Sequence, residues 1–217
     1  EEALPGRFEP FAATPLALVP GPPPGSRHLD NATAEVAESV LAAWPQLPES
    51  AGLDLLRRRP PRLLGGVSLP SLDGSPNQFV TAVRAATRLL DRSYLAVQGP
   101  PGTGKTYVAA QVIADLVGAH GWKIGVVAQS HAAVENVLDA VVRAGLPGDR
   151  VGKHAPGRTD APWRHLAHRD KDLAGFAAEH ADAGYLLGGT AYDFTHPKRC
   201  ARGQLDLLVI DEAGQYS

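Results

Sequence analysis

Residues 99–106 read Gly-Pro-Pro-Gly-Thr-Gly-Lys-Thr, and the interpretation of the whole chain starts from this stretch. It satisfies the pattern G-x-x-x-x-G-K-[ST], with a β-type run over residues 94–98 before it and a helical pattern over residues 105–117 after it. Glycines let backbone N–H groups wrap closely around a chain of phosphates, at a helix N-terminus whose dipole favours negative charge. A tight strand-to-helix turn would also need glycine, but it would not require the Lys-Thr pair. The stretch therefore predicts a phosphate-binding loop.

The residues of this loop have separate expected tasks. Lys105 would reach the β- and γ-phosphates of a nucleotide, and the Thr106 hydroxyl would bind Mg²⁺. ATP and Mg²⁺ are accordingly the expected cofactors. The predicted nucleotide-binding residues of this stretch are Gly99, Pro100, Pro101, Gly102, Thr103, Gly104, Lys105, Thr106 and Tyr107.

An acidic pair further along the chain completes the expected metal site. Residues 207–212 read Leu-Leu-Val-Ile-Asp-Glu, which is an apolar strand that ends in two carboxylates. Asp211 would hold Mg²⁺, and Glu212 would orient and polarise the attacking water. The alternative is a pair of surface acids that close a strand. We predict Lys105, Asp211 and Glu212 as the catalytic residues, with Thr106 and Asp211 as the metal ligands.

Strand and helix patterns alternate from residue 71 onwards. Apolar runs at residues 123–128, 185–190 and 205–210 are separated by helical patterns such as residues 132–142. Such alternation predicts an α/β fold with a parallel sheet flanked by helices. The run at 205–210 is continuously apolar, which is typical of a strand covered on both faces. We expect a P-loop NTPase domain over residues 71–217, in which the acidic strand comes last.

Residues 1–70 have a different composition. Thirteen of the 19 prolines lie in residues 1–76, and such density is typical of connecting segments. Two short helices are expected there, over residues 31–44 and 53–59. The chain has no methionine, even at position 1, so we expect it to be a piece of a longer polypeptide.

Composition and charge exclude several classes of protein. The formal net charge of −2 excludes a histone-like basic protein, and the single cysteine excludes an internal disulfide framework. No apolar run is long enough to cross a bilayer, and no secretory signal opens the chain. A cytoplasmic location fits these observations.

Five ordered motifs resemble those of superfamily 1 helicases, in the form found in the 1B branch that includes the nonsense-mediated-decay helicase. Residues 99–106 and 211–215 (Asp-Glu-Ala-Gly-Gln) resemble motifs I and II, and Asn77-Gln78 stands where that family has its Q motif. Residues 129–136 resemble motif Ia, and residues 188–191 resemble motif Ic. The resemblance covers residues 75–215 and implies the first RecA-like domain of a helicase.

A second likeness concerns residues 55–66, which contain the basic run at residues 57–62. They are similar to the stretch before the helicase in bacterial proteins that join a RecB-like nuclease to it. Residues 1–70 show no constellation of nuclease carboxylates. This likeness implies an N-terminal nuclease domain as a partner in the parent protein, and it favours DNA as the substrate.

The helicase resemblance implies further site residues. Gln78 would read adenine through its side-chain amide, but it also stands at the capping-box position of a helix that starts with Ser75. Ser130 and Thr190 would contact the phosphates of a single strand, and Asn136, one turn into the helix after Ser130, would be a further nucleic-acid-binding residue. Ser130 would equally serve as the N-cap of the helix that follows it.

The activity implied by the resemblance is ATP-dependent movement on single-stranded DNA or RNA. A second RecA-like domain is an expected partner, because the family's arginine motifs from that domain are not in this chain. We therefore expect the chain to bind ATP and to hydrolyse it poorly. Two alternatives remain, an AAA+ ring ATPase and a nucleotide-dependent binding switch. The 106 positions between Lys105 and Asp211 argue against the ring.

Residues 150–171 present an open choice between a basic path for a nucleic-acid strand and a solvated mixed face. Acidic residues are interleaved throughout, which favours the mixed face. The basic residues of this stretch are Arg150, Lys153, Arg158, Arg164, Arg169 and Lys171.

Overall fold

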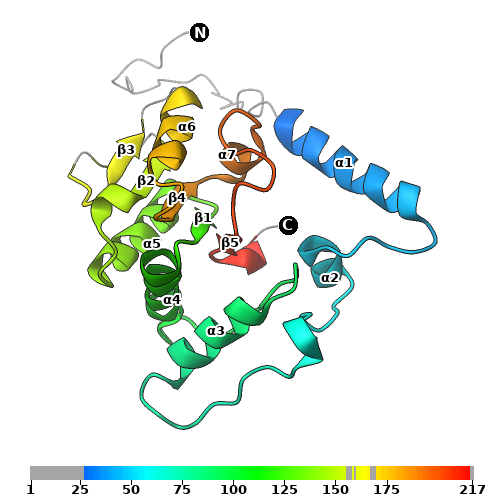
Figure 1. Ribbon diagram of the computed structural model, residues 1–217, viewed down its shortest axis with the longest axis horizontal. Helices are drawn as coiled ribbons and strands as arrows, with labels where there is room; N and C mark the ends of the chain where they lie inside the picture. Colours follow the sequence, from blue (N-terminus) through cyan, green and yellow to red (C-terminus); the bar gives the residue numbers. More distant parts are fainter. Residues whose placement is uncertain (1–26, 155–157, 159, 167–169, 216–217) are drawn as a thin grey trace, which may run out of the picture.

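The computed structural model describes residues 27–154, 158, 160–166 and 170–215. Within these ranges five strands form one sheet in the spatial order β3-β2-β4-β1-β5 (Figure 1), and every pairing is parallel. The strands are β1 (Lys123–Val127), β2 (Val151–His154), β3 (Arg164–Leu166), β4 (Tyr185–Gly189) and β5 (Leu207–Ile210). The parallel α/β sheet predicted from the alternating pattern is confirmed.

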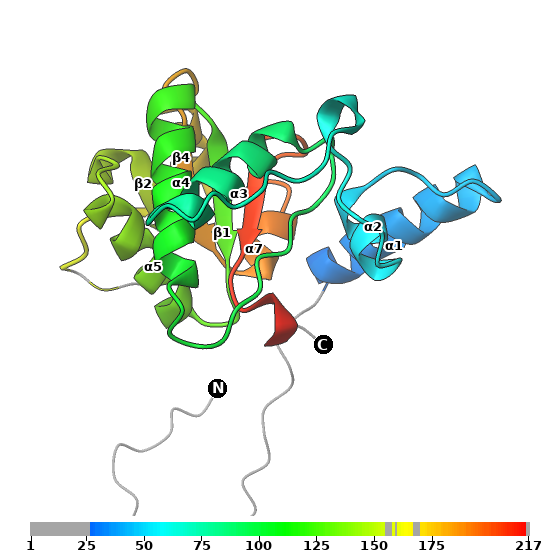
Figure 2. The same ribbon diagram turned by 90° about the horizontal axis from the view of Figure 1, so that it is seen from below.

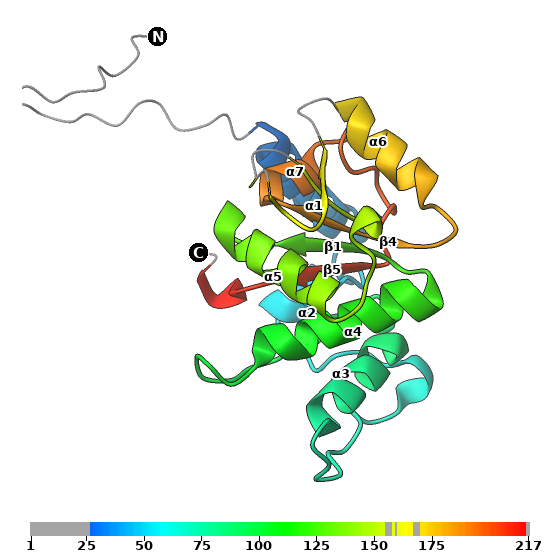
Figure 3. The same cartoon turned by 90° about the vertical axis from the view of Figure 1, so that its left-hand side faces the viewer.

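Helices cover both faces of the sheet (Figure 3). One face carries α4 (Lys105–His120) and α5 (His131–Arg143), with α3 (Gln78–Leu89) packed against α4. The other face carries α6 (Asp170–Glu179) and α7 (Ala191–Thr195), with α1 (Arg27–Ala43) packed against α7. The remaining elements are α2 (Ala51–Leu56) and the short 3-10 turns η1 (Leu64–Gly66), η2 (Gly148–Arg150) and η3 (Ala213–Gln215). No described helix combines the length and the apolar character that crossing a bilayer demands.

Alternate residues of β4 face two separate apolar cores. Leu186 is buried in the core built with α4 and α5, whereas Tyr185 and Leu187 are buried in the core built with α6. This division follows from the period-two geometry of a strand, whose side chains point to opposite faces in turn. Gly188 lies under α5, where an added Cβ would stand 2.7 Å from Val134 Cγ1 and 2.8 Å from Leu138 Cδ1.

The predicted strand over residues 94–98 is not formed, which corrects the sequence interpretation. The segment has no assigned secondary structure, and Val97 in it is exposed. It is held instead by an earlier part of the chain, since the Tyr94 hydroxyl donates to Arg59 O at 2.6 Å. Side-chain contacts with residues 54–62 therefore take the place of sheet pairing at this point.

A second correction concerns β5, which the apolar run 205–210 predicted to be covered on both faces. β5 stands at the end of the sheet and pairs with β1 alone among the described strands. Leu207 and Val209 pack on the core of α4 and α5, but Leu208 and Ile210 remain 44% and 45% exposed. The apolar run thus predicted the strand correctly, but the prediction that both of its faces are covered was wrong. Coverage of a strand depends on which elements pack beside it.

Helix boundaries also differ from the prediction. α3 begins at Gln78, and its N-cap Asn77 lies two residues after the expected Ser75 cap. Residues 164–166 and 170–179 form β3 and α6. The helices expected at 31–44 and 53–59 are present as α1 and α2 with shifted ends.

We predict that Gly188→Ala lowers the free energy of unfolding by about 1–3 kcal/mol, because the methyl group overpacks the contact between β4 and α5. Gly175→Ala in α6 is the matched control. No atom stands within 4 Å of its added Cβ, and alanine in a helix interior should raise stability by about 0.5–1 kcal/mol. Urea unfolding of both variants checks the prediction, and equal effects would contradict it.

Candidate nucleotide-binding site

The parallel register brings the predicted site residues to one edge of the sheet. Val127 of β1 pairs with Gly189 of β4 on one side and with Ile210 of β5 on the other. The three loops that follow these residues therefore start side by side at the carboxyl edge. They carry the predicted residues Ser130, Thr190, Asp211 and Glu212.

The phosphate loop opens at the same edge. α4 leads through a short turn into β1 and packs on the sheet, so its N-terminus at Lys105 lies at the carboxyl end of the strands. Figure 2 shows the loop that enters α4 and the end of β5 on the same side of the molecule. The carboxyl edge of a parallel sheet is where α/β proteins commonly bind ligands.

The loop has the backbone that its glycines permit. Gly102 and Gly104 have φ angles of 78° and 85°, in the left-handed region that favours glycine. Gly104 is the N-cap of α4, so the first N–H groups of the helix face the loop. These N–H groups and the helix dipole form the cradle that a phosphate requires.

Lys105 lies over its own loop. Its Nζ donates to Gly99 O at 2.7 Å and to Pro100 O at 2.9 Å. The Thr103 hydroxyl also donates to Pro100 O, at 2.8 Å. Two carbonyl oxygens thus take the place that phosphate oxygens would occupy around the ammonium group.

The donor atoms at this edge suit magnesium. Thr106, the second residue of α4, supplies a hydroxyl oxygen, and Asp211 supplies a carboxylate oxygen; both are hard ligands. The Asp211 N–H donates to Val127 O at 2.9 Å, which holds this residue at the end of β5. In the described ranges no group of three or more His, Cys, Asp or Glu side chains could hold a metal.

Glu212 has an unusual backbone. Its φ is 51°, in the left-handed region, which costs energy for a residue with a Cβ. The side chain is exposed at the carboxyl edge. Strained residues of this kind cluster at functional sites, and Arg58 and Arg92 share the conformation, with φ angles of 54° and 48°.

A small cavity of about 180 Å³ lies between α3 and α4, beside the phosphate loop. Of the predicted nucleotide-binding residues, Tyr107 lines this cavity and Gln78 does not. The Gln78 Oε1 instead accepts from the Gly74 N–H at 2.9 Å, which closes the turn before α3. Asn77, which the sequence analysis placed in the Q motif, lines this cavity. The sequence analysis missed three further polar residues of the cavity, although their positions on two adjacent helices were a usable signal: Thr81, Arg84 and Gln111.

Ser130 and Thr190 differ in what their hydroxyl groups can still bind. Ser130 Oγ accepts from the Ala133 N–H at 3.1 Å, so Ser130 is the N-cap of α5 and keeps its hydroxyl proton for another acceptor. The Thr190 hydroxyl donates to Asp193 Oδ2 at 2.9 Å, which uses its only proton. Asn136 is exposed on α5. Of the two hydroxyl groups, only that of Ser130 can donate to a phosphate without breaking a bond in this arrangement.

Asp193 organises the loop after β4. The Thr190 N–H donates to its Oδ2 at 2.8 Å, and its Oδ1 lies 2.6 Å from Arg199 and 3.4 Å from His154 Nδ1. Burial raises the pKa of Asp193, but the hydrogen bonds from Thr190 and Arg199 outweigh burial and hold the pKa below its ordinary value. The sequence analysis missed Asp193, although Thr190-x-x-Asp193 has the spacing of a capping box.

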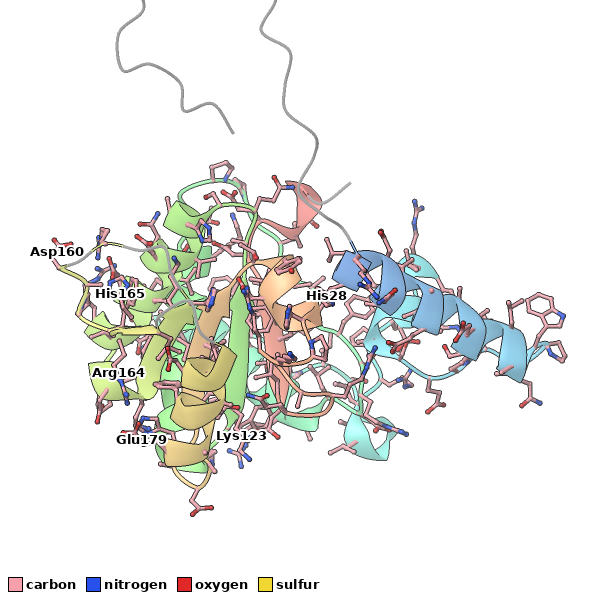
Figure 4. All side chains as sticks on the ribbon, turned by 90° about the horizontal axis from the view of Figure 1, so that it is seen from above. His28, Lys123, Asp160, Arg164, His165 and Glu179 are labelled. Carbon is pink, nitrogen blue, oxygen red and sulfur yellow. The ribbon has the colours of Figure 1, made fainter. Side chains whose placement is uncertain are left out.

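The described basic residues between 150 and 166 each have partners in the chain. Lys153 is fully buried and lies 3.2 Å from Glu135, and Arg158 bonds Asp139. Arg164 and Glu179, labelled in Figure 4, form an ion pair at 2.8 Å. These contacts argue against a basic path. The exposed Arg158 and Arg164 fit the mixed face, whereas the buried Lys153 lies on no solvated face. Arg169 and the side chain of Lys171 lie outside the described residues.

Comparison with known proteins agrees with this geometry. A protein-family model described as an AAA domain matches residues 77–217. The chain is 30% identical to the "Regulator of nonsense transcripts 1 homolog" of Drosophila melanogaster over 188 residues, which is 83% of this chain and 14% of that protein. It is 33% identical to the "ATP-dependent helicase upf1" of Schizosaccharomyces pombe over 44% of this chain and 10% of that protein.

A third relative is the "DNA polymerase alpha-associated DNA helicase A" of Schizosaccharomyces pombe, which is 39% identical over 27% of this chain and 9% of that protein. No solved structure matches the chain significantly. The matched part of this chain spans 14% or less of the length of each of the three relatives.

The phosphate loop, the parallel sheet and the acidic pair together define a RecA-like P-loop domain. The chain belongs to the AAA domain family, whose model matches residues 77–217. Its similarity to the proteins above agrees with the superfamily 1 helicase resemblance of the five motifs.

We predict that Asp193→Ala lowers the free energy of unfolding by about 3 kcal/mol at pH 7, because it leaves the partly buried Arg199 guanidinium without its carboxylate and removes the acceptor of the Thr190 N–H. Because the pKa of Asp193 is lower in the folded state, its contribution is present at neutral pH and is lost as the pH falls below about 4 through the folded-state pKa. The difference in free energy of unfolding between the variant and wild type should become smaller over that range. Denaturant titrations at several pH values measure this difference. The exposed Asp160→Ala is the control, and its free energy of unfolding is expected to stay within about 0.5 kcal/mol of wild type.

Proposed function

We propose that residues 71–217 are the first RecA-like domain of a superfamily 1B helicase, and that they bind Mg-ATP. The observation that carries this proposal is the single sheet edge that holds the phosphate loop, the Asp211-Glu212 pair and the Ser130 hydroxyl. A nucleotide and a single strand bound at this edge would be neighbours, as a motor requires.

Nucleotide binding would use the chain's own donors. Lys105 would exchange the Gly99 and Pro100 carbonyls for phosphate oxygens, which are stronger acceptors for an ammonium group. Thr106 and Asp211 would hold the magnesium ion, which supplies positive charge to the phosphates when it is bound. Glu212 would orient the attacking water and accept its proton. The nearby cavity with Tyr107 would receive the base, with Gln78 beside it.

The expected polymer is a single strand of DNA or RNA, gripped at its phosphates. Ser130 has a hydroxyl proton available at the N-terminus of α5, where the helix dipole also favours an anion. Thr190 and Asn136 are the further contacts implied by the resemblance. We favour DNA because of the nuclease-linked likeness of residues 55–66, since phosphate contacts alone carry no base identity.

We further propose that this chain hydrolyses ATP slowly by itself. Phosphoryl transfer depends on charges placed around the γ-phosphate, and an arginine finger typically contributes about 10³–10⁵ in rate. The second RecA-like domain would supply those arginines in the complete protein. Alternating grips of two such domains on the strand would convert ATP turnover into steps.

Two other functions share the same site. An AAA+ ring ATPase would hydrolyse ATP without response to a single strand. A nucleotide-dependent switch would bind a partner in ATP and would not move. The strand-facing hydroxyl of Ser130 beside the ATP site favours the helicase over both.

We predict that Lys105→Ala weakens Mg-ATP binding by about tenfold or more, because the chain loses its charged bond to the phosphates. Glu212→Gln should leave binding within about twofold of wild type, since its role is in the hydrolysis step. Titration with a fluorescent ATP analogue measures both. Equal binding by wild type and Lys105→Ala would refute the nucleotide site. In the complete polypeptide, ATPase activity that ignores oligonucleotides would refute the helicase.

We predict that Ser130→Gly weakens binding to single-stranded DNA by about tenfold, the effect of one hydrogen bond to a charged group. Glycine is chosen because it retains most of the N-cap stability. Thr190→Val should have a smaller effect, because the Thr190 hydroxyl donates to Asp193. Fluorescence anisotropy at fixed salt measures the affinity of both variants for single-stranded DNA. A larger loss of affinity in Thr190→Val than in Ser130→Gly would show that the Thr190 hydroxyl turns to the DNA.

A further inference from the structure

The segment that leads into the phosphate loop is held by a part of the chain that composition describes as a connector. Asp54 of α2 is buried, with 3% of its surface exposed, and it binds the Arg62 guanidinium in an ion pair. The Ser93 hydroxyl donates to Asp54 Oδ2 at 3.0 Å, and the Arg62 N–H donates to Ser93 Oγ at 3.0 Å. We call these three residues the clamp.

Backbone contacts extend the clamp along the segment Leu90–Tyr94. Arg62 NH2 donates to Arg92 O at 3.0 Å and to Asp91 O at 3.3 Å. The Asp91 N–H donates back to Arg62 O at 3.0 Å, and Leu63 forms an isolated bridge with Leu90. One arginine therefore joins α2 to the end of α3 through its side chain and its backbone.

An exposed ion pair in the same region contrasts with the buried pair of the clamp. Arg92 and Glu49 lie 3.7 Å apart, with 76% and 62% of their side chains exposed. Such surface pairs contribute little, whereas the loss of one partner from a buried pair leaves an uncompensated charge. The burial of Asp54 thus distinguishes a fixed link from an incidental surface contact in the same neighbourhood.

The position of the clamp relates it to the nucleotide site. Ser93 precedes Gly99 by six residues, and residues 94–98 between them pair with no described strand. The path of the chain into the loop is consequently set at Ser93 and Tyr94 upstream, and by the loop's own hydrogen bonds downstream. The clamp also fixes the end of α3, the helix that lines the cavity together with Tyr107.

We propose that Asp54 and Arg62 are positioning residues for the nucleotide site, acting through Ser93 on the segment that leads into the phosphate loop. The inference rests on the proposed function for its ligand, and on the clamp contacts for its mechanism. Residues 51–63 then belong to the nucleotide-binding unit.

The test compares Asp54→Asn and the milder Ser93→Ala with Glu49→Gln, which removes an exposed charge from the same region. We expect Asp54→Asn to raise the Kd for a fluorescent Mg-ATP analogue about tenfold and Ser93→Ala about threefold, with Glu49→Gln unchanged. Hydrogen–deuterium exchange should be faster in residues 94–106 of both clamp variants and unchanged in β4. A general loss of stability would instead accelerate exchange in β4 as well.

Each outcome decides one of the two proposals. Unchanged Kd and unchanged exchange in residues 94–106 of a folded Ser93→Ala variant would overturn the positioning role. If Asp54→Asn fails to fold, Ser93→Ala carries the test. A wild-type chain that binds no Mg-ATP would refute the proposed function, and exchange accelerated only in residues 94–106 would still support the clamp.

Discussion

Parallel hydrogen bonding between β1 and its two neighbours is the constraint on which the rest of the site depends. It places Val127, Gly189 and Ile210 at one level, so the loops after three adjacent strands begin together. α4 and α5 both have their N-termini at this edge, because each is connected directly to β1. A shift of one residue in either pairing would exchange the faces of a whole strand and bury the wrong side chains. The apolar cores on both faces therefore maintain the register that assembles the site.

Hydrogen-bond capacity distinguishes groups that look alike in the sequence. Ser130 and Thr190 both follow a strand and both precede a helix, yet the Asp193 carboxylate uses the proton of only one of them. Lys105 meets two carbonyl oxygens of its own loop, so phosphate binding would be an exchange of acceptors. In each case the decisive quantity is which donors and acceptors already have partners.

The proline-rich stretch shows how composition and structure can disagree. Proline density predicted connecting segments over residues 1–76, and the described part of that stretch carries no strand of the sheet. It did not reveal that Asp54 and Arg62 bind residues more than 28 positions further along the chain. A buried carboxylate needs a partner, but a sequence does not state where that partner lies. The run 94–98 was misinterpreted for the same reason, since its apolar pattern suits a strand while its contacts are to the connector.

The phosphate loop, the acidic pair and the alternation of strands and helices were determined by the sequence itself. They depend on local chemistry: glycines that permit left-handed φ angles, a lysine and threonine at a helix start, and apolar runs of strand length. The N-cap role of Ser130 also follows from its position directly before a helix in the sequence. Tertiary structure alone decided that β5 is an edge strand, that Gln78 closes a turn beside the cavity, that Asp193 holds Thr190, and that Asp54 holds the segment before the loop. These features are contacts between residues far apart in the chain or choices between competing hydrogen-bond partners, and they exist only once the sheet and its helices have packed.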